Sequence, residues 1–160
     1  MAKVVVTEQQ VIAESWVMWV RTIVLGALLG IIFWVTALLI GHYIVEPLTC
    51  RQIVNASLCL DATPLAGKIA TVLVAVIAVF ALIRLNAARP IVLAVATAAL
   101  LWDLSAWTLG LFWLEAIAWS IILYAVCFAL FAWITRYAAL WVTIVVSLLI
   151  VIAIRIALVL

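Results

Sequence analysis

Three ionisable residues, Asp103, Glu115 and Arg155, lie inside long apolar stretches of the sequence. A charged side chain in the hydrocarbon region of a bilayer is costly unless it is paired or hydrated, and such residues often serve proton or ion pathways. These three residues are therefore the leading candidates for a polar core that does chemistry.

Their spacing places them at similar depths. Asp103 precedes Gly110 and Glu115 follows it, so at ~1.5 Å per helical residue both carboxylates lie ~7–11 Å below the outer end of one hairpin. Arg155 stands near the end of the last apolar stretch, ~25 Å from its inner edge. We expect the three side chains to meet in the outer leaflet.

Three interpretations of this cluster remain open. In the first, Arg155 neutralises one carboxylate and the cluster is a clasp that fixes helix packing. In the second, one carboxylate stays free and exchanges a proton against a cationic substrate, because burial and a like-charged neighbour favour its protonated form. In the third, Glu115 lies in water at the start of a helix.

Four tryptophans crowd the same hairpin. Tryptophan is common at the lipid–water interface, and this belt is one explanation for them. Their rings also offer π faces that attract a lipophilic or quaternary cation, so they could line a cation site. The four are Trp102, Trp107, Trp113 and Trp119.

Two cysteines, Cys50 and Cys59, lie in the one long polar loop, residues 42–63. In an oxidising compartment they are expected to form a disulfide, worth ~2–3 kcal/mol. The alternative is two free thiols in a reducing compartment. Their spacing fits neither a CxxC redox pair nor a zinc site.

Two glycines, Gly26 and Gly30, form the sequence GALLG in the first apolar stretch. Small residues four apart share a helix face and allow two backbones to approach closely. The partner is either another helix of the chain or a second subunit. Because a chain of this size seldom encloses a path by itself, we expect a homo-oligomer or association with other membrane subunits.

Metal-dependent and other enzymatic chemistry is disfavoured. His42 and Glu46 flank the end of the first apolar stretch and could bind a metal or join a proton pathway, but a lone histidine at a membrane boundary is more often an interfacial polar residue. No catalytic or phosphate-binding motif occurs. We expect no cofactor and no metal, and enzymatic activity is disfavoured rather than excluded, because membrane enzymes can lack recognisable motifs.

The elements that position these residues follow from composition. Hydrophobic residues make up 73% of the 160-residue chain and charged residues 9%, in runs of about 20 residues that suit membrane helices. The runs lack the alternation of a barrel, so we predict an all-α polytopic membrane bundle in the lipid bilayer. An amphipathic interfacial helix, residues 1–21, either lies on the membrane or continues into the first span. The predicted spans are 22–41, 64–84, 90–109, 112–135 and 138–160.

Basic residues set the expected orientation. With the N-terminus in the cytoplasm, Arg51 and Lys68 lie outside, and more basic residues lie inside, as the positive-inside rule requires. The inner residues are Lys3, Arg21, Arg84, Arg89 and Arg136. The loop 42–63 and the C-terminus are then extracytoplasmic, and we expect a bacterial inner (plasma) membrane. The formal net charge of +2 is too small for a nucleic-acid partner.

Together these patterns favour a small transporter or channel-like protein for a cation or small solute. The main alternative is a structural or accessory subunit of a larger membrane complex. A third, weaker alternative is a membrane-embedded enzyme or lipid-handling protein that uses the loop 42–63.

Overall fold

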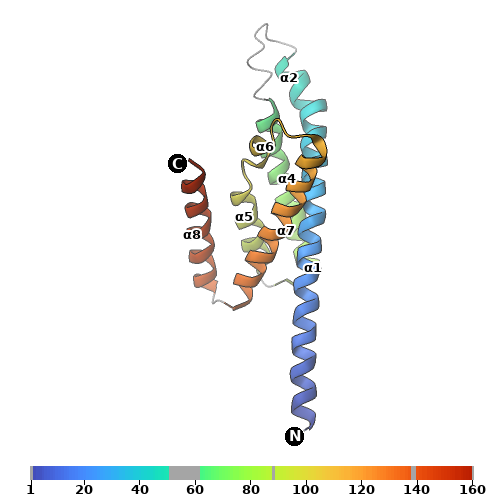
Figure 1. The fold of residues 1–160 in the computed structure, drawn as a ribbon, viewed down its shortest axis with the longest axis vertical. Helices are drawn as coiled ribbons and strands as arrows, with labels where there is room; N and C mark the ends of the chain where they lie inside the picture. The colour runs from blue at the N-terminus through green and yellow to red at the C-terminus, as the bar shows by residue number, and fades with distance from the viewer. Residues whose placement is uncertain (1, 51–61, 88, 138–139, 160) are drawn as a thin grey trace.

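The computed structural model describes residues 2–50, 62–87, 89–137 and 140–159, with side chains described at 16–48, 64–87, 89–135, 141–154 and 156. Within these ranges all regular structure is helical, as the sequence predicts (Figure 1). Four helices are long and apolar enough to cross a membrane, and α8 contributes a shorter apolar segment, Trp141–Ile154. The protein is an all-α polytopic membrane bundle.

The first helix, α1 (Ala2–Ile40), is unbroken. It includes both the N-terminal amphipathic segment and the first predicted span. Of the two arrangements expected for that segment, the structure shows the one in which it continues into the span as a single helix. Its N-terminal end projects well beyond the other helices (Figure 1).

The helix also extends further at its other end than the sequence predicts. A π-helical turn, η1 (Gly41–Val45), leads into α2 (Glu46–Cys50), so the first half of the predicted polar loop is helical. The Glu46 N–H donates to the Gly41 carbonyl, five residues back. This wider turn accommodates Pro47, whose ring would clash with the Tyr43 carbonyl in a regular α-helix.

Four further helices and a short helical turn complete the bundle. Pro90 occupies the first turn of α5, where its missing N–H costs nothing. The link before it is tight, because Asn86 and Arg89 both adopt left-handed backbone conformations, with φ of 51° and 57°. The elements are α4 (Ala62–Arg84), α5 (Pro90–Leu100), α6 (Leu104–Trp107), α7 (Trp113–Tyr137) and α8 (Leu140–Val159).

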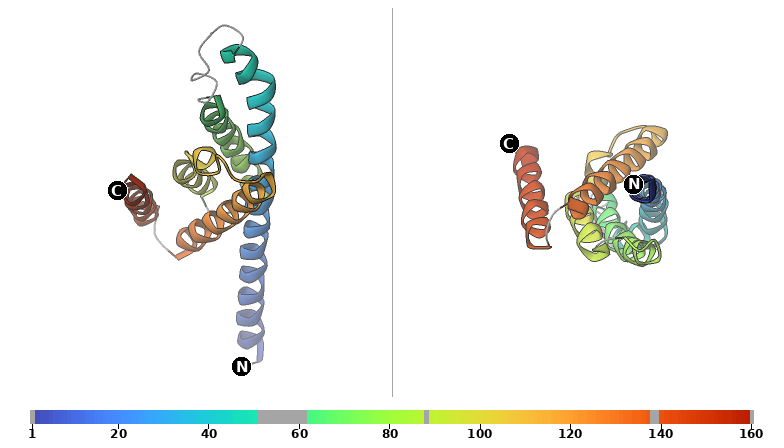
Figure 2. Two further views of the ribbon diagram at one scale, coloured as in Figure 1. Left: turned by 45° about the horizontal axis from the view of Figure 1, so that its top comes forward. Right: turned by 90° about the horizontal axis from the view of Figure 1, so that it is seen from below.

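The helices pack around an apolar core that includes Leu29, Phe33, Phe128 and Phe131, each at most 2% exposed. The α1 helix packs against α7 and α4, and α5 packs against α4. The last helix, α8, stands apart from this group and packs chiefly on α5 (Figure 2). It is therefore the least embedded helix of the bundle.

The glycines of the GALLG sequence lie at the α1–α7 contact. A Cβ atom added at Gly30 would lie 2.6 Å from the Ser120 carbonyl oxygen, and one added at Gly26 would lie 2.9 Å from the Phe128 Cβ. Neither position has room for a side chain. The close partner of this glycine face is therefore an internal helix, α7.

We predict that Gly30→Ala destabilises the protein by about 1–3 kcal/mol, because the added methyl group meets backbone rather than a flexible side chain. Thermal unfolding of the detergent-solubilised protein measures this change. Gly41→Ala is the matched control, since a Cβ there would lie 3.7 Å from the Ala66 Cβ, an ordinary contact. Equal melting temperatures for the two variants would contradict the close α1–α7 approach.

Candidate functional site

The third span is broken near one end of the bundle. Helix α5 ends at Leu100 and the turn α6 begins at Leu104, so residues 101–103 form a bend between them. The Leu104 N–H donates to the Leu101 carbonyl at 3.1 Å. This bond joins residues three apart, whereas an α-helical bond joins residues four apart. Leu101 and Leu104 are at most 1% exposed. The bend therefore lies within the protein, where irregular backbone is tolerated in a membrane.

Asp103 lies at this bend and forms an ion pair with Lys68 of α4. The Lys68 Nζ lies 3.8 Å from the Asp103 Oδ1, and the two side chains are 42% and 32% exposed. The second span begins at Pro64. Lys68 is four residues further along α4, a rise of ~6 Å. The pair thus lies about one helical turn inside the end of the span.

A close contact beside the ion pair explains why these residues meet. A Cβ atom added at Gly67 would lie 2.2 Å from the Ser105 Cβ, so α4 and α6 touch at a position that only glycine fits. Lys68 is the next residue along α4, and Asp103 lies two residues before Ser105. The glycine contact therefore sets the register that brings the two charges together.

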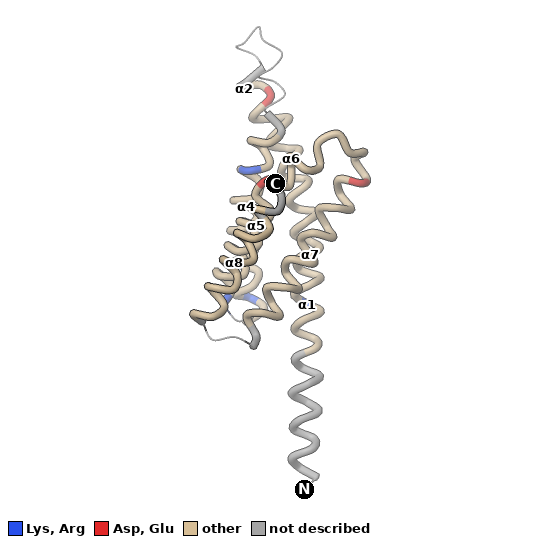
Figure 3. Tube along the Cα trace, turned by 60° about the vertical axis from the view of Figure 1, so that its left-hand side comes forward, with Lys and Arg blue, Asp and Glu red and all other residues tan. Residues whose placement is uncertain are grey.

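Charge is concentrated toward the two ends of the bundle, with an uncharged length between them (Figure 3). Arg84 ends α4 and Arg89 precedes α5 at one end. Lys68 and Asp103 lie at the opposite ends of the same two spans. This distribution is what the cost of burying charge in lipid requires.

Glu115 occupies a different environment from Asp103. It is exposed in the first turn of α7, where the partial positive charge of a helix N-terminus favours a carboxylate. Of the three predicted core residues, Asp103 is half-buried and paired and Glu115 is exposed. Arg155 is on α8, and its side chain lies outside the described residues.

The four hairpin tryptophans are all partly exposed. Trp102 and Trp107 are 38% and 39% exposed, and Trp113 and Trp119 are 54% and 51% exposed. Trp102 directly precedes Asp103, at the bend. It is therefore the predicted aromatic residue nearest in sequence to the ion pair.

An apolar groove of about 350 Å³ runs between α4 and α5 and reaches this bend. Trp102 forms part of its lining. The other lining residues are small or aliphatic, so the groove is apolar and ends at Trp102, the residue next to Asp103. They include Val72, Val76 and Val79 of α4 and Val95 and Ala99 of α5.

The remaining polar residues do not extend this site. His42 Nδ1 lies 3.0 Å from Glu46 Oε2, and both side chains are more than half exposed, as expected of an interfacial pair one turn apart. Among the described residues, no group of three or more metal-ligating side chains occurs. The predicted Cys50–Cys59 disulfide lies outside the described side chains, while Cys127 is a buried free thiol.

Lys68 is the residue that sequence reasoning missed. The sequence-based topology counted Lys68 among the basic residues expected outside the membrane and did not pair it with Asp103. The available signal was its depth, since it stands one turn beyond the first-turn Pro64, at a level comparable to that of Asp103.

Comparison with known proteins finds no matching family model, no similar curated protein and no similar solved structure.

We predict that the Lys68–Asp103 pair contributes about 0.5–1 kcal/mol of coupling energy, because it is partly hydrated. A double-mutant cycle of Lys68→Gln and Asp103→Asn, followed by thermal unfolding, measures this coupling. Each single variant loses stability, and the double variant loses less than the sum. A cycle of Lys68→Gln with Glu115→Gln is the control and gives additive effects. Additive effects of Lys68→Gln and Asp103→Asn would show that the two charges do not interact.

Proposed function

We propose that this protein is a small membrane transporter or channel-like protein that moves a cation or small solute, with Asp103 as its working group. The observation that carries the proposal is the Lys68–Asp103 pair at a broken span, reached by an apolar groove. Helices interrupted inside the membrane recur at the substrate sites of secondary transporters, where irregular backbone lines the site.

Exchange of partners at Asp103 is the proposed mechanism. A lipophilic cation enters the α4–α5 groove from the bilayer and meets the π face of Trp102, which attracts positive charge. It then replaces Lys68 as the counter-ion of Asp103. Lys68 is 42% exposed, so its ammonium group can move to the headgroup region on its flexible stem.

A second candidate is a structural or accessory subunit of a larger membrane complex. The specific observation in its favour is that the charges of Lys68 and Asp103 already balance within the chain, beside the tight Gly67–Ser105 contact. In this function the pair only fixes the packing of α4 against α6. The two candidates differ in what the loss of Asp103 does.

The proposal includes an orientation and an assembly state. Arg84 and Arg89 belong on the cytoplasmic side by the positive-inside rule, which puts the N-terminus inside and the C-terminus outside. A bacterial inner (plasma) membrane is the proposed location. Because the α4–α5 groove is open rather than an enclosed path through the bundle, the proposed working form is a homo-oligomer or a complex with other membrane subunits.

We predict that Asp103→Asn lowers the flux of tetraphenylphosphonium in proteoliposomes by at least about tenfold, equivalent to ~1.4 kcal/mol of lost cation stabilisation. The amide keeps the shape of the side chain but cannot balance a cation. Glu115→Gln is the matched carboxylate control and retains the parent flux. Size-exclusion profiles of all three proteins establish that the fold is retained.

Two outcomes would overturn the transport proposal. One is a parent protein that moves neither tetraphenylphosphonium nor a monovalent metal cation. The other is equal flux in the parent and in Asp103→Asn. Either result, combined with a measurable Lys68–Asp103 coupling energy, would favour the structural subunit.

We predict that Cys50 and Cys59 react with a membrane-impermeant maleimide added outside intact cells only after reduction. This follows if the loop is extracytoplasmic and the two cysteines are joined. Cys127 is 5% exposed and buried in α7, so it serves as an internal control that stays unlabelled. Labelling of Cys50 and Cys59 only after the cells are opened would contradict the orientation.

A further inference from the structure

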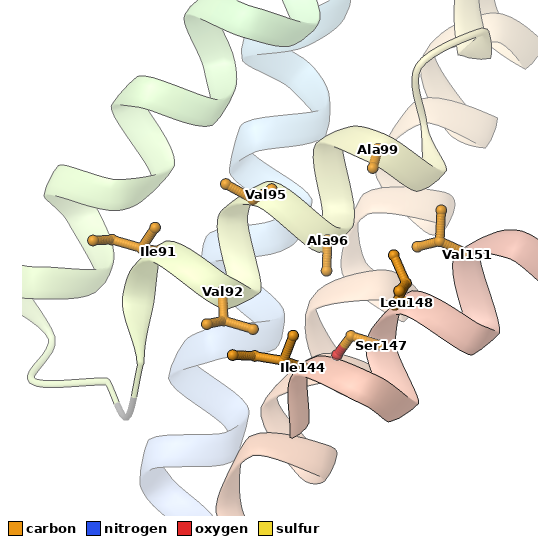
Figure 4. A pocket seen from close by; sticks show the side chains of 9 residues that line it. All are labelled: Ile91, Val92, Val95, Ala96, Ala99, Ile144, Ser147, Leu148 and Val151. Carbon is orange, nitrogen blue, oxygen red and sulfur yellow. The ribbon is translucent and has the colours of Figure 1, made fainter. Parts of the chain in front are cut away.

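A second apolar groove, of about 280 Å³, separates α8 from α5 (Figure 4). Aliphatic side chains of both helices line it, with Ser147 as the polar member. Lining residues include Ile91, Val92, Val95 and Ala96 of α5 and Ile144 and Leu148 of α8. The groove explains why α8 stands apart from the rest of the bundle.

The length of this groove matches one leaflet of a bilayer. From Ile91 to Ala99 the α5 wall rises ~12 Å, and from Ile144 to Val151 the α8 wall rises ~10 Å. Half of a hydrocarbon core of ~30 Å is ~15 Å. A single acyl chain lying along the groove would therefore occupy most of the depth of its own leaflet.

A guanidinium group stands at the mouth of the groove. Arg89 directly precedes α5, and its Nη1 donates to the Thr143 Oγ1 of α8 at 2.5 Å. Thr143 is fully buried, so this bond ties the first turns of the two helices together where the groove begins. Arg84, at the end of α4, is exposed in the same connection. The mouth is therefore positively charged.

The N-termini of α5 and α8 add to the positive electrostatic potential at the mouth of the groove. Helices α5 and α8 run in the same direction and both begin at the end of the bundle where Arg89 lies (Figure 1). A helix N-terminus carries a partial positive charge, so two of them favour an anion between them. The carboxylates Asp103 and Glu115 lie toward the other end of the bundle, at the end of the third span and at the start of α7.

Inside the groove, the Ser147 hydroxyl has no hydrogen-bond partner among the described residues, although the residue is 4% exposed. Its side chain lies between the two helices, across from Ala96 (Figure 4). Ser147 is one turn beyond Thr143, ~6 Å deeper in the membrane. A buried hydroxyl in this position favours an acceptor on whatever fills the groove, because leaving it unpaired is costly.

We propose that the α5–α8 groove binds an anionic glycerophospholipid. Its phosphate lies at Arg89 and Arg84, one ester carbonyl accepts a hydrogen bond from Ser147, and one acyl chain fills the groove. Basic pockets between membrane helices on the cytoplasmic side bind anionic headgroups for the same electrostatic reason. The site is separate from the Lys68–Asp103 pair and does not depend on the transport proposal.

Native mass spectrometry of the full chain in detergent tests this site. Phosphatidylglycerol and phosphatidylcholine with identical acyl chains are added to the delipidated protein, and the lipid-bound fraction is compared. We expect phosphatidylglycerol to be retained roughly fivefold better, the factor contributed by one basic residue near an anionic headgroup. Arg84→Gln and Arg89→Gln each reduce this preference, and Ala96→Phe, which fills the groove, removes lipid of both kinds.

Matched controls separate the site from general effects. Arg21→Gln removes an exposed charge from α1, which is not part of the groove, and Ala153→Phe adds the same bulk to an exposed position of α8 outside it. Both retain the parent preference. Because Arg84 is exposed, its variant keeps the test valid if Arg89→Gln fails to fold.

Three results would overturn the proposal. The first is equal retention of the two lipids by the parent. The second is an unchanged preference in both arginine variants. The third is a parent dimer that Ala96→Phe dissociates, which would assign the groove to a second copy of this chain.

Discussion

The contact between α1 and α7 is the constraint on which the rest of the bundle depends. At Gly30 the two backbones approach so closely that a methyl group would meet the Ser120 carbonyl. In lipid there is no hydrophobic drive between helices, so such close packing is what holds them together. Because α4 packs on α1, and α5 on α4, the position of the whole bundle follows from this one seam.

Several buried hydroxyl groups donate hydrogen bonds within their own helices. Thr71, Thr97 and Ser120 donate to the Gly67, Leu93 and Ala116 carbonyls, each four residues back. These residues therefore place polar atoms in the core without requiring a partner on another helix. The α5–α8 contact differs from this pattern. It has the interhelical Arg89–Thr143 bond and the Ser147 hydroxyl, which has no hydrogen-bond partner among the described residues.

The sequence predicts the helical class and most spans, because runs of apolar residues and first-turn prolines such as Pro64 and Pro90 are local signals. The extension of the first helix through residue 50 is not predictable in this way, because Pro47 indicates an end unless a π-turn accommodates it. The partner of Asp103 was missed for a different reason. Spacing gives depth along a helix, but the direction of a side chain around it depends on contacts such as Gly67 against Ser105.

The length of α1 has a consequence for the side of the membrane on which it begins. Helix α1 continues from Trp16 toward the N-terminus through residues 2–15, a further ~20 Å of unbroken helix. The length of such a helix is fixed by its backbone hydrogen bonds. This distance of ~20 Å is more than two Debye lengths, ~8 Å each at physiological salt. Charges at that distance along an upright α1 are therefore screened from charges at the level of Trp16.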